Sequence, residues 1–275
     1  MIVSIPDSLN TSTSEKYLMS IRLRPDGLSF SAYDPGEGQS FFYRELSFDP
    51  ALPYIDSLKE SFFDNECFAW NYKRTDLLCA NSPYIVVPAW LAEKTEWHRL
   101  LDFAYISPSS RCLDNPLEEA GAEVLFTLDE AVYEFCARSL ANPVFTHSLT
   151  PELIMLGKQA MGLPAGRHLF AVIDRHGVDL LCFNASKLLF ANTFAYEQAE
   201  DILYYLLYAW QQLQLDQLGD TLSLSGETAL CSQLTETLRL YIRQISPVDI
   251  PSKAYLLGGE IMQAPLDQIL FTVCE

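Results

Sequence analysis

The chain has 275 residues, 49% of them hydrophobic, which is the composition of a globular protein with room for one large domain or two ordinary ones. It carries 36 acidic against 18 basic residues and a formal net charge of −18. Binding to a nucleic-acid backbone or to an anionic membrane surface requires clustered Lys and Arg. We therefore expect an acidic, cytoplasmic protein with no nucleic-acid partner.

The N-terminal region and the cysteines support the same location. Residues 1–16 are polar and rich in Ser and Thr, so they predict a flexible arm and not a signal peptide. The longest apolar stretch, Ile202–Trp210, is too short to cross a bilayer, so no membrane insertion is expected. Seven cysteines lie far apart without a CxxC pair or metal-ligand spacing to a His, which predicts buried thiols in a reducing compartment.

The first half opens with three strands and a helix. Alternating residues flank a Pro-Asp-Gly turn, which is typical of a β-hairpin. A proline then fits the first turn of a helix, where its missing N–H costs little. In chain order the predicted elements are strand Tyr17–Leu23, turn Pro25-Asp26-Gly27, strands Leu28–Tyr33 and Ser40–Phe48, helix Leu52–Phe63 and strand Cys67–Tyr72.

An elaboration of the first half spans about residues 76–143 and leads to a domain boundary. It is predicted to contain strands Asp76–Ala80 and Tyr84–Val87, helix Trp90–Leu101, an irregular stretch over residues 107–119, strand Glu123–Thr127 and helix Asp129–Leu140. A further helix begins at Thr150 and stops at a Gly- and Pro-rich cluster, residues 162–166. We place the boundary there, between a first lobe of residues 17–165 and a second lobe of residues 166–275.

The second lobe repeats the same plan. Its predicted elements are strand Leu169–Ile173, turn Asp174-Arg175-His176-Gly177, strands Val178–Phe183 and Lys187–Phe194, helix Glu197–Leu215, strand Thr221–Leu224, helix Ala229–Ile242, strand Ala254–Leu257 and a final apolar segment Ile269–Val273. Tyr204, Tyr205 and Tyr208 on the long helix are expected to pack half-buried against the sheet, with a partner-binding stripe as the alternative. A duplicated unit of three strands and a helix is compatible with few known folds.

This duplicated pattern resembles the actin-like ATPase superfamily, which includes actin, the Hsp70 chaperones, sugar kinases and a pilus-assembly branch. The resemblance implies an α/β fold of duplicated ribonuclease-H-like lobes, each with a mixed five-stranded sheet in the order 3-2-1-4-5, flanked by helices. Leu222–Glu227 resembles the adenosine-motif strand and loop of the pilus-assembly branch. Phe194–Tyr196 and Glu200–Tyr205, with the closing Cys274-Glu275, resemble an uncharacterised Bacteroidetes family, a domain of unknown function.

Members of this superfamily hold ATP-Mg with two Gly-containing hairpin turns, each needing an Asp, a close backbone approach and a hydroxyl. The resemblance therefore implies a nucleotide site at Asp26, Gly27, Asp174, Gly177 and Gly226. All three motifs depart from the pattern. The first turn contains a proline and displaces its Asp, neither turn has the hydroxyl, and the adenosine loop follows its glycine with an acidic residue.

These departures predict a pseudo-ATPase: a non-catalytic protein-interaction or scaffold module with an unknown protein partner, no cofactor and no catalytic or metal-binding residue. The alternative is a divergent ATP-binding enzyme or nucleotide switch that uses Asp174 for Mg²⁺. A two-metal nuclease built on Asp26, Asp174, Asp179 and Glu227 is a third possibility that the net charge disfavours. The oligomeric state stays open.

Overall fold

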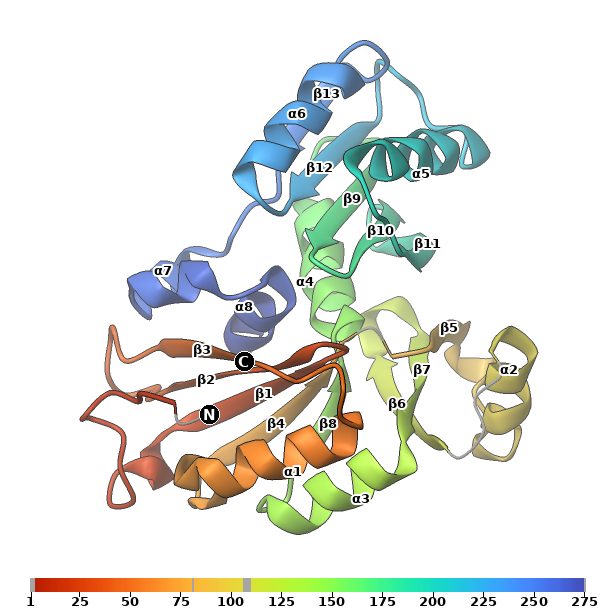
Figure 1. Ribbon diagram of the computed structural model, residues 1–275. Coiled ribbons are helices and arrows are strands. Elements are labelled where there is room, and N and C mark those ends of the chain that lie inside the picture. Colours follow the sequence, from red (N-terminus) through yellow and green to blue (C-terminus); the bar gives the residue numbers. More distant parts are fainter. Residues whose placement is uncertain (1–2, 81, 106–109, 275) are drawn as a thin grey trace. The chain divides into compact units, whose positions relative to one another are not determined.

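The computed structural model describes residues 3–80, 82–105 and 110–274 and divides into two compact units (Figure 1). Unit 1 comprises Met1–Pro116, Gly121–Thr150 and Pro251–Ala264, and unit 2 comprises Leu117–Ala120, Pro151–Ile250 and Pro265–Glu275. The chain thus returns to unit 1 after residue 250, which the sequence pattern did not predict. Each unit is built on its own five-stranded sheet.

The sheet of unit 1 has the order β3-β2-β1-β4-β8. Its strands are β1 (Leu18–Arg24), β2 (Gly27–Tyr33), β3 (Phe42–Ser47), β4 (Arg74–Cys79) and β8 (Val144–His147). β1 pairs antiparallel with β2 but parallel with β4, so the chain must cross over between β3 and β4. Helix α1 (Tyr54–Asp64) makes that crossover, and α3 (Glu130–Ser139) packs beside it (Figure 1).

A smaller sheet of order β5-β7-β6 is inserted between β4 and α3. It contains β5 (Tyr84–Pro88), β6 (Ser110–Leu117) and β7 (Ala122–Asp129), with helix α2 (Trp97–Ala104) packed on it through a small apolar cluster. The short 3-10 helices η3 (Ala89–Leu91), η4 (Lys94–Glu96) and η5 (Glu118–Ala120) connect these elements. Part of the stretch predicted to be irregular is therefore strand β6, while residues 106–109 lie outside the described residues.

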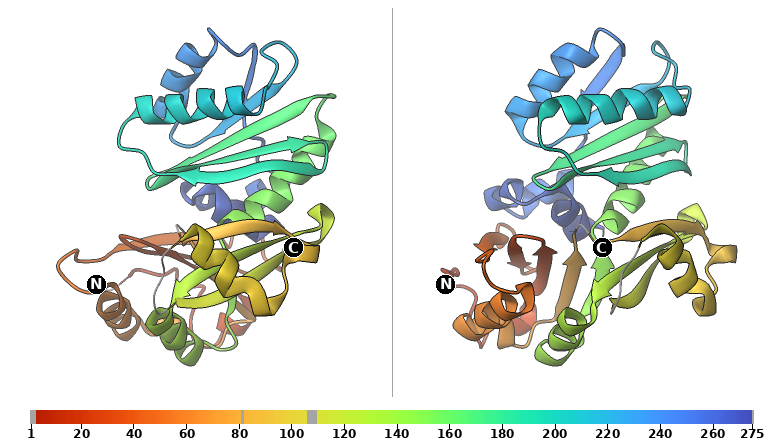
Figure 2. Two further views of the ribbon diagram at one scale, coloured as in Figure 1. Left: turned by 90° about the vertical axis from the view of Figure 1, so that its right-hand side faces the viewer. Right: turned by 45° about the vertical axis from the view of Figure 1, so that its right-hand side comes forward.

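The sheet of unit 2 repeats that of unit 1 in the order β11-β10-β9-β12-β13. Its strands are β9 (Arg167–Asp174), β10 (Gly177–Asn184), β11 (Lys187–Phe194), β12 (Thr221–Ser225) and β13 (Gln244–Pro247). Helices α5 (Ala199–Gln212) and α6 (Thr228–Leu238) cover one face of this sheet, as both views of Figure 2 show for α5, and α4 (Leu149–Gly162) leads into it. Both sheets have the predicted order 3-2-1-4-5.

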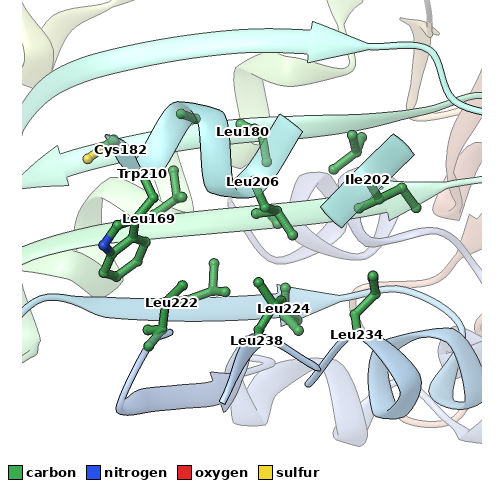
Figure 3. Packing of buried hydrophobic residues seen from close by; sticks show 14 of the residues in the cluster. Leu169, Leu180, Cys182, Ile202, Leu206, Trp210, Leu222, Leu224, Leu234 and Leu238 are labelled. Atoms are coloured by element: carbon green, nitrogen blue, oxygen red, sulfur yellow. The ribbon is translucent and has the colours of Figure 1, made fainter. Parts of the chain in front are cut away.

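The core of unit 2 forms between this sheet and α5 and α6 (Figure 3). Inward-facing residues of β9, β10 and β12 meet helix residues spaced three or four apart, such as Ile202, Leu206 and Trp210. Leu206 is fully buried, and Leu234 and Leu238 of α6 close the same cluster. The helical spacing predicted from the sequence is therefore the spacing that builds this core.

Two predicted strands are wrong. Cys67–Tyr72 begins instead with the 3-10 helix η2 (Glu66–Ala69), because Phe68 stacks on Phe62 of α1 and packs edge-on to Phe30 below the sheet. Ala254–Leu257 lies in helix α7 (Ser252–Leu256) and the 3-10 helix η6 (Gly259–Gln263) follows. The fifth strand is instead β13, whose mostly exposed polar residues offer no alternating pattern, and the final apolar segment is helix α8 (Leu266–Val273).

The residues before β1 pack against unit 1 more closely than a flexible arm would. They form a 3-10 helix, η1 (Ser14–Lys16), and bury the side chains of Leu9 and Ser14. The backbone N–H of Val3 donates to Oδ1 of Asn65 at 2.7 Å. A polar, Ser-rich composition hides such local turns, because their stability comes from side-chain to backbone bonds.

The core packing of unit 2 predicts the effect of one matched pair of substitutions. Leu206→Ala removes a fully buried side chain and should lower the free energy of unfolding by about 3 kcal/mol. Leu240→Ala, at a position 78% exposed, should change it by less than about 0.5 kcal/mol. Urea denaturation followed by intrinsic tryptophan fluorescence measures both. Equal effects would contradict this assignment of the core.

Candidate functional site

The first predicted phosphate turn joins β1 and β2 in unit 1 and is occupied by its own side chains. Arg24 is nearly fully buried, and its guanidinium pairs with Asp26 (Nε to Oδ1, 3.3 Å) and with Glu45 of β3 (Nη1 to Oε2, 3.0 Å). The one cation of this turn is therefore already neutralised by two carboxylates, and Asp26 is engaged in that pairing and not directed to a metal-bound water.

Gly27 has a structural reason to be glycine. Its φ is +154°, and a Cβ there would lie 2.0 Å from the carbonyl oxygen of Leu46 on β3. Its own carbonyl accepts a hydrogen bond from the hydroxyl of Tyr54, the first residue of α1, at 3.1 Å. The close backbone approach at Gly27 is thus made by strand β3 and by α1, where a phosphate is held in the superfamily pattern.

The second turn and the adenosine loop meet in unit 2. Asp174 and Gly177 flank the β9–β10 turn, and Gly226 follows β12, which pairs in parallel with β9. A Cβ on Gly226 would lie 2.9 Å from both Cβ and the carbonyl oxygen of Ile173, so the two strand ends are in direct contact. The fold therefore brings Asp174, Gly177 and Gly226 together, as the sequence predicts.

This second group of residues is acidic. Oδ1 of Asp174 accepts the N–H of Arg175 at 2.7 Å, and the carbonyl of Asp174 accepts the hydroxyl of Tyr196 at 2.8 Å. The pKa of Tyr196 is raised by burial and then by the negative charges of Asp174 and Glu227. Tyr196 was not predicted as a site residue. The negative charges of Asp174 and Glu227 at this position would repel a phosphate.

The described residues contain no group of three or more His, Cys, Asp or Glu side chains placed to hold a metal ion. Asp26 lies in unit 1, whereas Asp174, Asp179 and Glu227 lie in unit 2. Within unit 2, Asp179 accepts a hydrogen bond from the hydroxyl of Thr193 on β11 and so supports the sheet. The carboxylates that a two-metal nuclease would use are therefore not gathered into one site in either unit.

Unit 1 contains a pocket of about 510 Å³ that sequence reasoning missed. It lies where β1 and β4 end and where α1 and α3 begin, beside the first turn. Its walls combine apolar side chains with four hydroxyls, one guanidinium and one carboxylate: Leu23, Arg24, Pro25, Tyr54, Ile55, Ala80, Ser82, Pro83, Ser110, Thr127, Leu128, Asp129 and Val132. Its volume is in the range of small-ligand and peptide-anchor sites.

A buried histidine hydrogen-bonds to the pocket wall at Ser82, and the one cation among the described lining residues, Arg24, is paired with two carboxylates. Nδ1 of His147 accepts the N–H of Leu149 at 3.1 Å, so the proton is on Nε2, which donates to the carbonyl of Ser82 at 3.1 Å. Burial lowers the pKa of His147 to about 4. Asp129 accepts the N–H of Val132 as the cap of α3, and its negative charge remains at the pocket wall.

Comparison with known proteins now places the chain. A family model described as "Protein of unknown function (DUF3822)" matches residues 6–245. The chain belongs to this family. Among curated proteins, none matches significantly.

Two solved structures share the fold. A protein of actin-like ATPase fold and unknown function from Bacteroides thetaiotaomicron is 27% identical over 97% of this chain and 99% of its own, with a TM-score of 0.82. PilM, in the PilM–PilN type IV pilus biogenesis complex, is 15% identical over 92% of this chain and 94% of its own, with a TM-score of 0.53. The fold is therefore that of the actin-like ATPases, and the resemblance to an uncharacterised family that includes Bacteroides proteins is confirmed. No helix within the described ranges is long and apolar enough to cross a membrane.

Gly27 provides a test of whether the first turn serves strand packing. Gly27→Ala should lower the free energy of unfolding by about 2 kcal/mol or more, because the added Cβ meets the carbonyl of Leu46. Gly162→Ala, where a Cβ meets nothing within 4 Å, should be close to neutral. Urea denaturation of both variants measures the difference, and a neutral Gly27→Ala would remove the structural explanation of this glycine.

His147 predicts a pH dependence of stability. Its folded pKa of about 4 lies below the unfolded value near 6.5, so only the unfolded chain binds this proton between those pH values. The contribution of neutral His147 to the free energy of unfolding is fully present above pH 6.5. It decreases as the pH falls toward 4, by about 2 kcal/mol between pH 6.5 and 5. Denaturation at several pH values should show this component in the parent protein and not in His147→Gln; identical slopes would contradict it.

Proposed function

We propose that this protein is a non-catalytic member of the actin-like ATPase fold that binds a protein partner. The observation that carries the proposal is the occupied first turn, where Arg24 is paired with Asp26 and Glu45 and the backbone contact at Gly27 is made by β3. A phosphate would have to break these ion pairs and displace a strand. In unit 2 the negative charges of Asp174 and Glu227 would instead repel a phosphate directly.

The proposed partner site is the pocket of unit 1. Leu23, Ile55 and Val132 offer apolar walls, while Asp129 adds a negative charge that the already paired Arg24 does not offset. A partner segment with an apolar anchor residue beside a Lys or Arg would match both features. The neighbouring fold in PilM forms a complex with PilN, which supports a protein and not a small molecule as the occupant.

The absence of nucleotide binding is tested directly by calorimetry and thermal shift with ATP and ADP, with and without Mg²⁺. No saturable heat and no rise in melting temperature at 1 mM nucleotide, on the order of ten times a Kd of 100 μM, are expected. Saturable ATP-Mg binding in the parent protein that Asp174→Ala abolishes would establish the alternative, a divergent ATP-binding enzyme or switch, and overturn the proposal.

The pocket is tested with a displayed library of random peptides. Selected peptides should combine an apolar residue with Lys or Arg, and Ser82→Trp, which fills the pocket, should weaken their binding at least tenfold. Ser232→Trp, at an exposed position of α6 in unit 2, is the matched control and should leave binding unchanged. Peptides that bind both variants equally well would place the partner site elsewhere.

A further inference from the structure

Unit 2 contains an apolar cavity of about 120 Å³. The apolar side chains that line it are those of Leu117, Leu153, Ile154, Phe183 and Leu188, all of which belong to unit 2. They come from the end of β6, from α4 and from the β10–β11 hairpin. A cavity of about 150 Å³ lined by Leu, Ile and Phe stays dry and binds benzene. The cavity of unit 2 therefore has the size and the lining to hold a small apolar group.

The cavity lies on the sheet face opposite α5 and α6. Leu169 and Cys182 belong to the core under α5 and α6, so the residues that alternate with them, Phe170 and Phe183, point to the opposite face. The two phenyl rings are buried there and pack edge-on at 6.0 Å. Helix α4 packs on this face, since a Cβ on Gly157 would lie 3.2 Å from the ring of Phe183. Glycine at this position lets α4 approach the sheet, and the cavity lies beside this contact.

A β-bulge in β11 turns Leu188 toward the cavity. Cys182 lies opposite Phe190 but Phe183 lies opposite Leu188, so β11 contains one extra residue, Leu189. Without it, alternation would place Leu188 on the same face as Phe190, which packs against the core under α5. The extra residue places Leu188 on the face of Phe183 instead and leaves Leu189 38% exposed. This wall of the cavity thus depends on a specific backbone feature of the strand.

The mouth of the cavity is acidic. Glu118 and Glu119 of η5 belong to its lining and are exposed to solvent. Nζ of Lys158 on α4 lies 3.4 Å from Oε1 of Glu119, so the charge of Glu119 is partly offset. Glu118 forms no ion pair with the residues that the structure describes, and its negative charge remains at the mouth. The site therefore combines an apolar interior with one uncompensated carboxylate.

We propose that this cavity binds a small aliphatic amine, whose alkyl group fills the interior while its ammonium group lies in water beside Glu118. The volume corresponds to an alkyl group of about five carbon atoms, since about 150 Å³ accommodates the six carbons of benzene. The charge of Glu118 favours a cation over a neutral or anionic head group. A protein segment is a less suitable occupant, because reaching the interior would bury Glu118, Glu119 and Lys158 and remove their hydration. The site is independent of the partner pocket in unit 1.

Three probes with the same branched alkyl group test the charge preference. Isopentylamine, isopentanol and isocaproate carry a positive, a neutral and a negative head group, respectively. NMR titrations of protein with isotope-labelled Leu and Ile methyl groups measure their binding. Saturable shifts are expected for Leu117, Leu153 and Leu188, with isopentylamine binding at least threefold more tightly than isopentanol and isocaproate binding most weakly. The proposal is overturned if isopentylamine does not saturate these shifts by about 50 mM, or if isocaproate binds as tightly as the amine.

A substitution at the mouth locates the ligand. Ala120 belongs to the lining and is exposed, so a larger side chain there blocks the cavity without disturbing buried packing. Ala120→Phe should weaken the binding of isopentylamine at least tenfold. Ala195→Phe, at an exposed position after β11, is the matched control and should leave binding unchanged. Circular dichroism verifies that both variants are folded, and equal binding to the two would show that the ligand lies outside this cavity.

Glu118→Gln tests the role of the carboxylate, because it removes the charge and keeps the size of the side chain. It should bring the affinity for isopentylamine close to that for isopentanol and leave isopentanol binding unchanged. Glu236→Gln, at an exposed position of α6, should preserve the preference for the amine. An unchanged preference in Glu118→Gln contradicts the proposed position of the ammonium group. A capped Leu-Lys dipeptide that binds where isopentylamine does not would identify a protein segment as the occupant and overturn the proposal.

Discussion

The parallel pairing of the first strand of each unit with the fourth is the constraint on which the rest of the molecule depends. β1 with β4 and β9 with β12 cannot be joined by a tight turn, so a helix must cross the sheet between them. That crossover brings the hairpin turns, the carboxyl ends of the parallel strands and the starts of the helices to the same end of each sheet. The turns that depart from the phosphate pattern lie at this end of their sheets, and so does the pocket of unit 1.

The duplicated units share this constraint but depart from the superfamily's phosphate pattern at their hairpin turns. In unit 1 the buried guanidinium of Arg24 is paired with the partly exposed carboxylates of Asp26 and Glu45, and a ligand that drew both carboxylates away would leave a buried charge without compensation. In unit 2 the turn keeps its geometry but gathers Asp174 and Glu227. The departures from the phosphate pattern therefore take a different physical form in each unit.

The units also differ in how their edges end. In unit 1 the carbonyls of Leu256 and Leu257 accept the N–H groups of Gln39 and Phe41 just before β3, and Glu260 accepts that of Tyr43 on β3. Unit 2 leaves β11 uncovered beside exposed Tyr204 and Tyr208. Unpaired strand edges are a liability that proteins manage by covering or pairing them.

The strand order 3-2-1-4-5 was implied by the resemblance to the actin-like ATPase superfamily, whereas the duplication and the departures from the phosphate motifs could be predicted from the sequence pattern. These follow from alternation, from helical spacing such as that of Ile202, Leu206 and Trp210, and from residue types at fixed turns. The contacts between residues far apart in the sequence could be found only from the folded structure. They include Arg24 with Glu45, His147 with Ser82, and Glu260 with Arg44. The folded structure also decided that polar Gln244–Pro247 is a strand and apolar Cys67–Phe68 is not. The local sequence pattern shows which side of a helix or strand is apolar. Strand pairing and pockets depend on which segment, distant in the sequence, packs against that side.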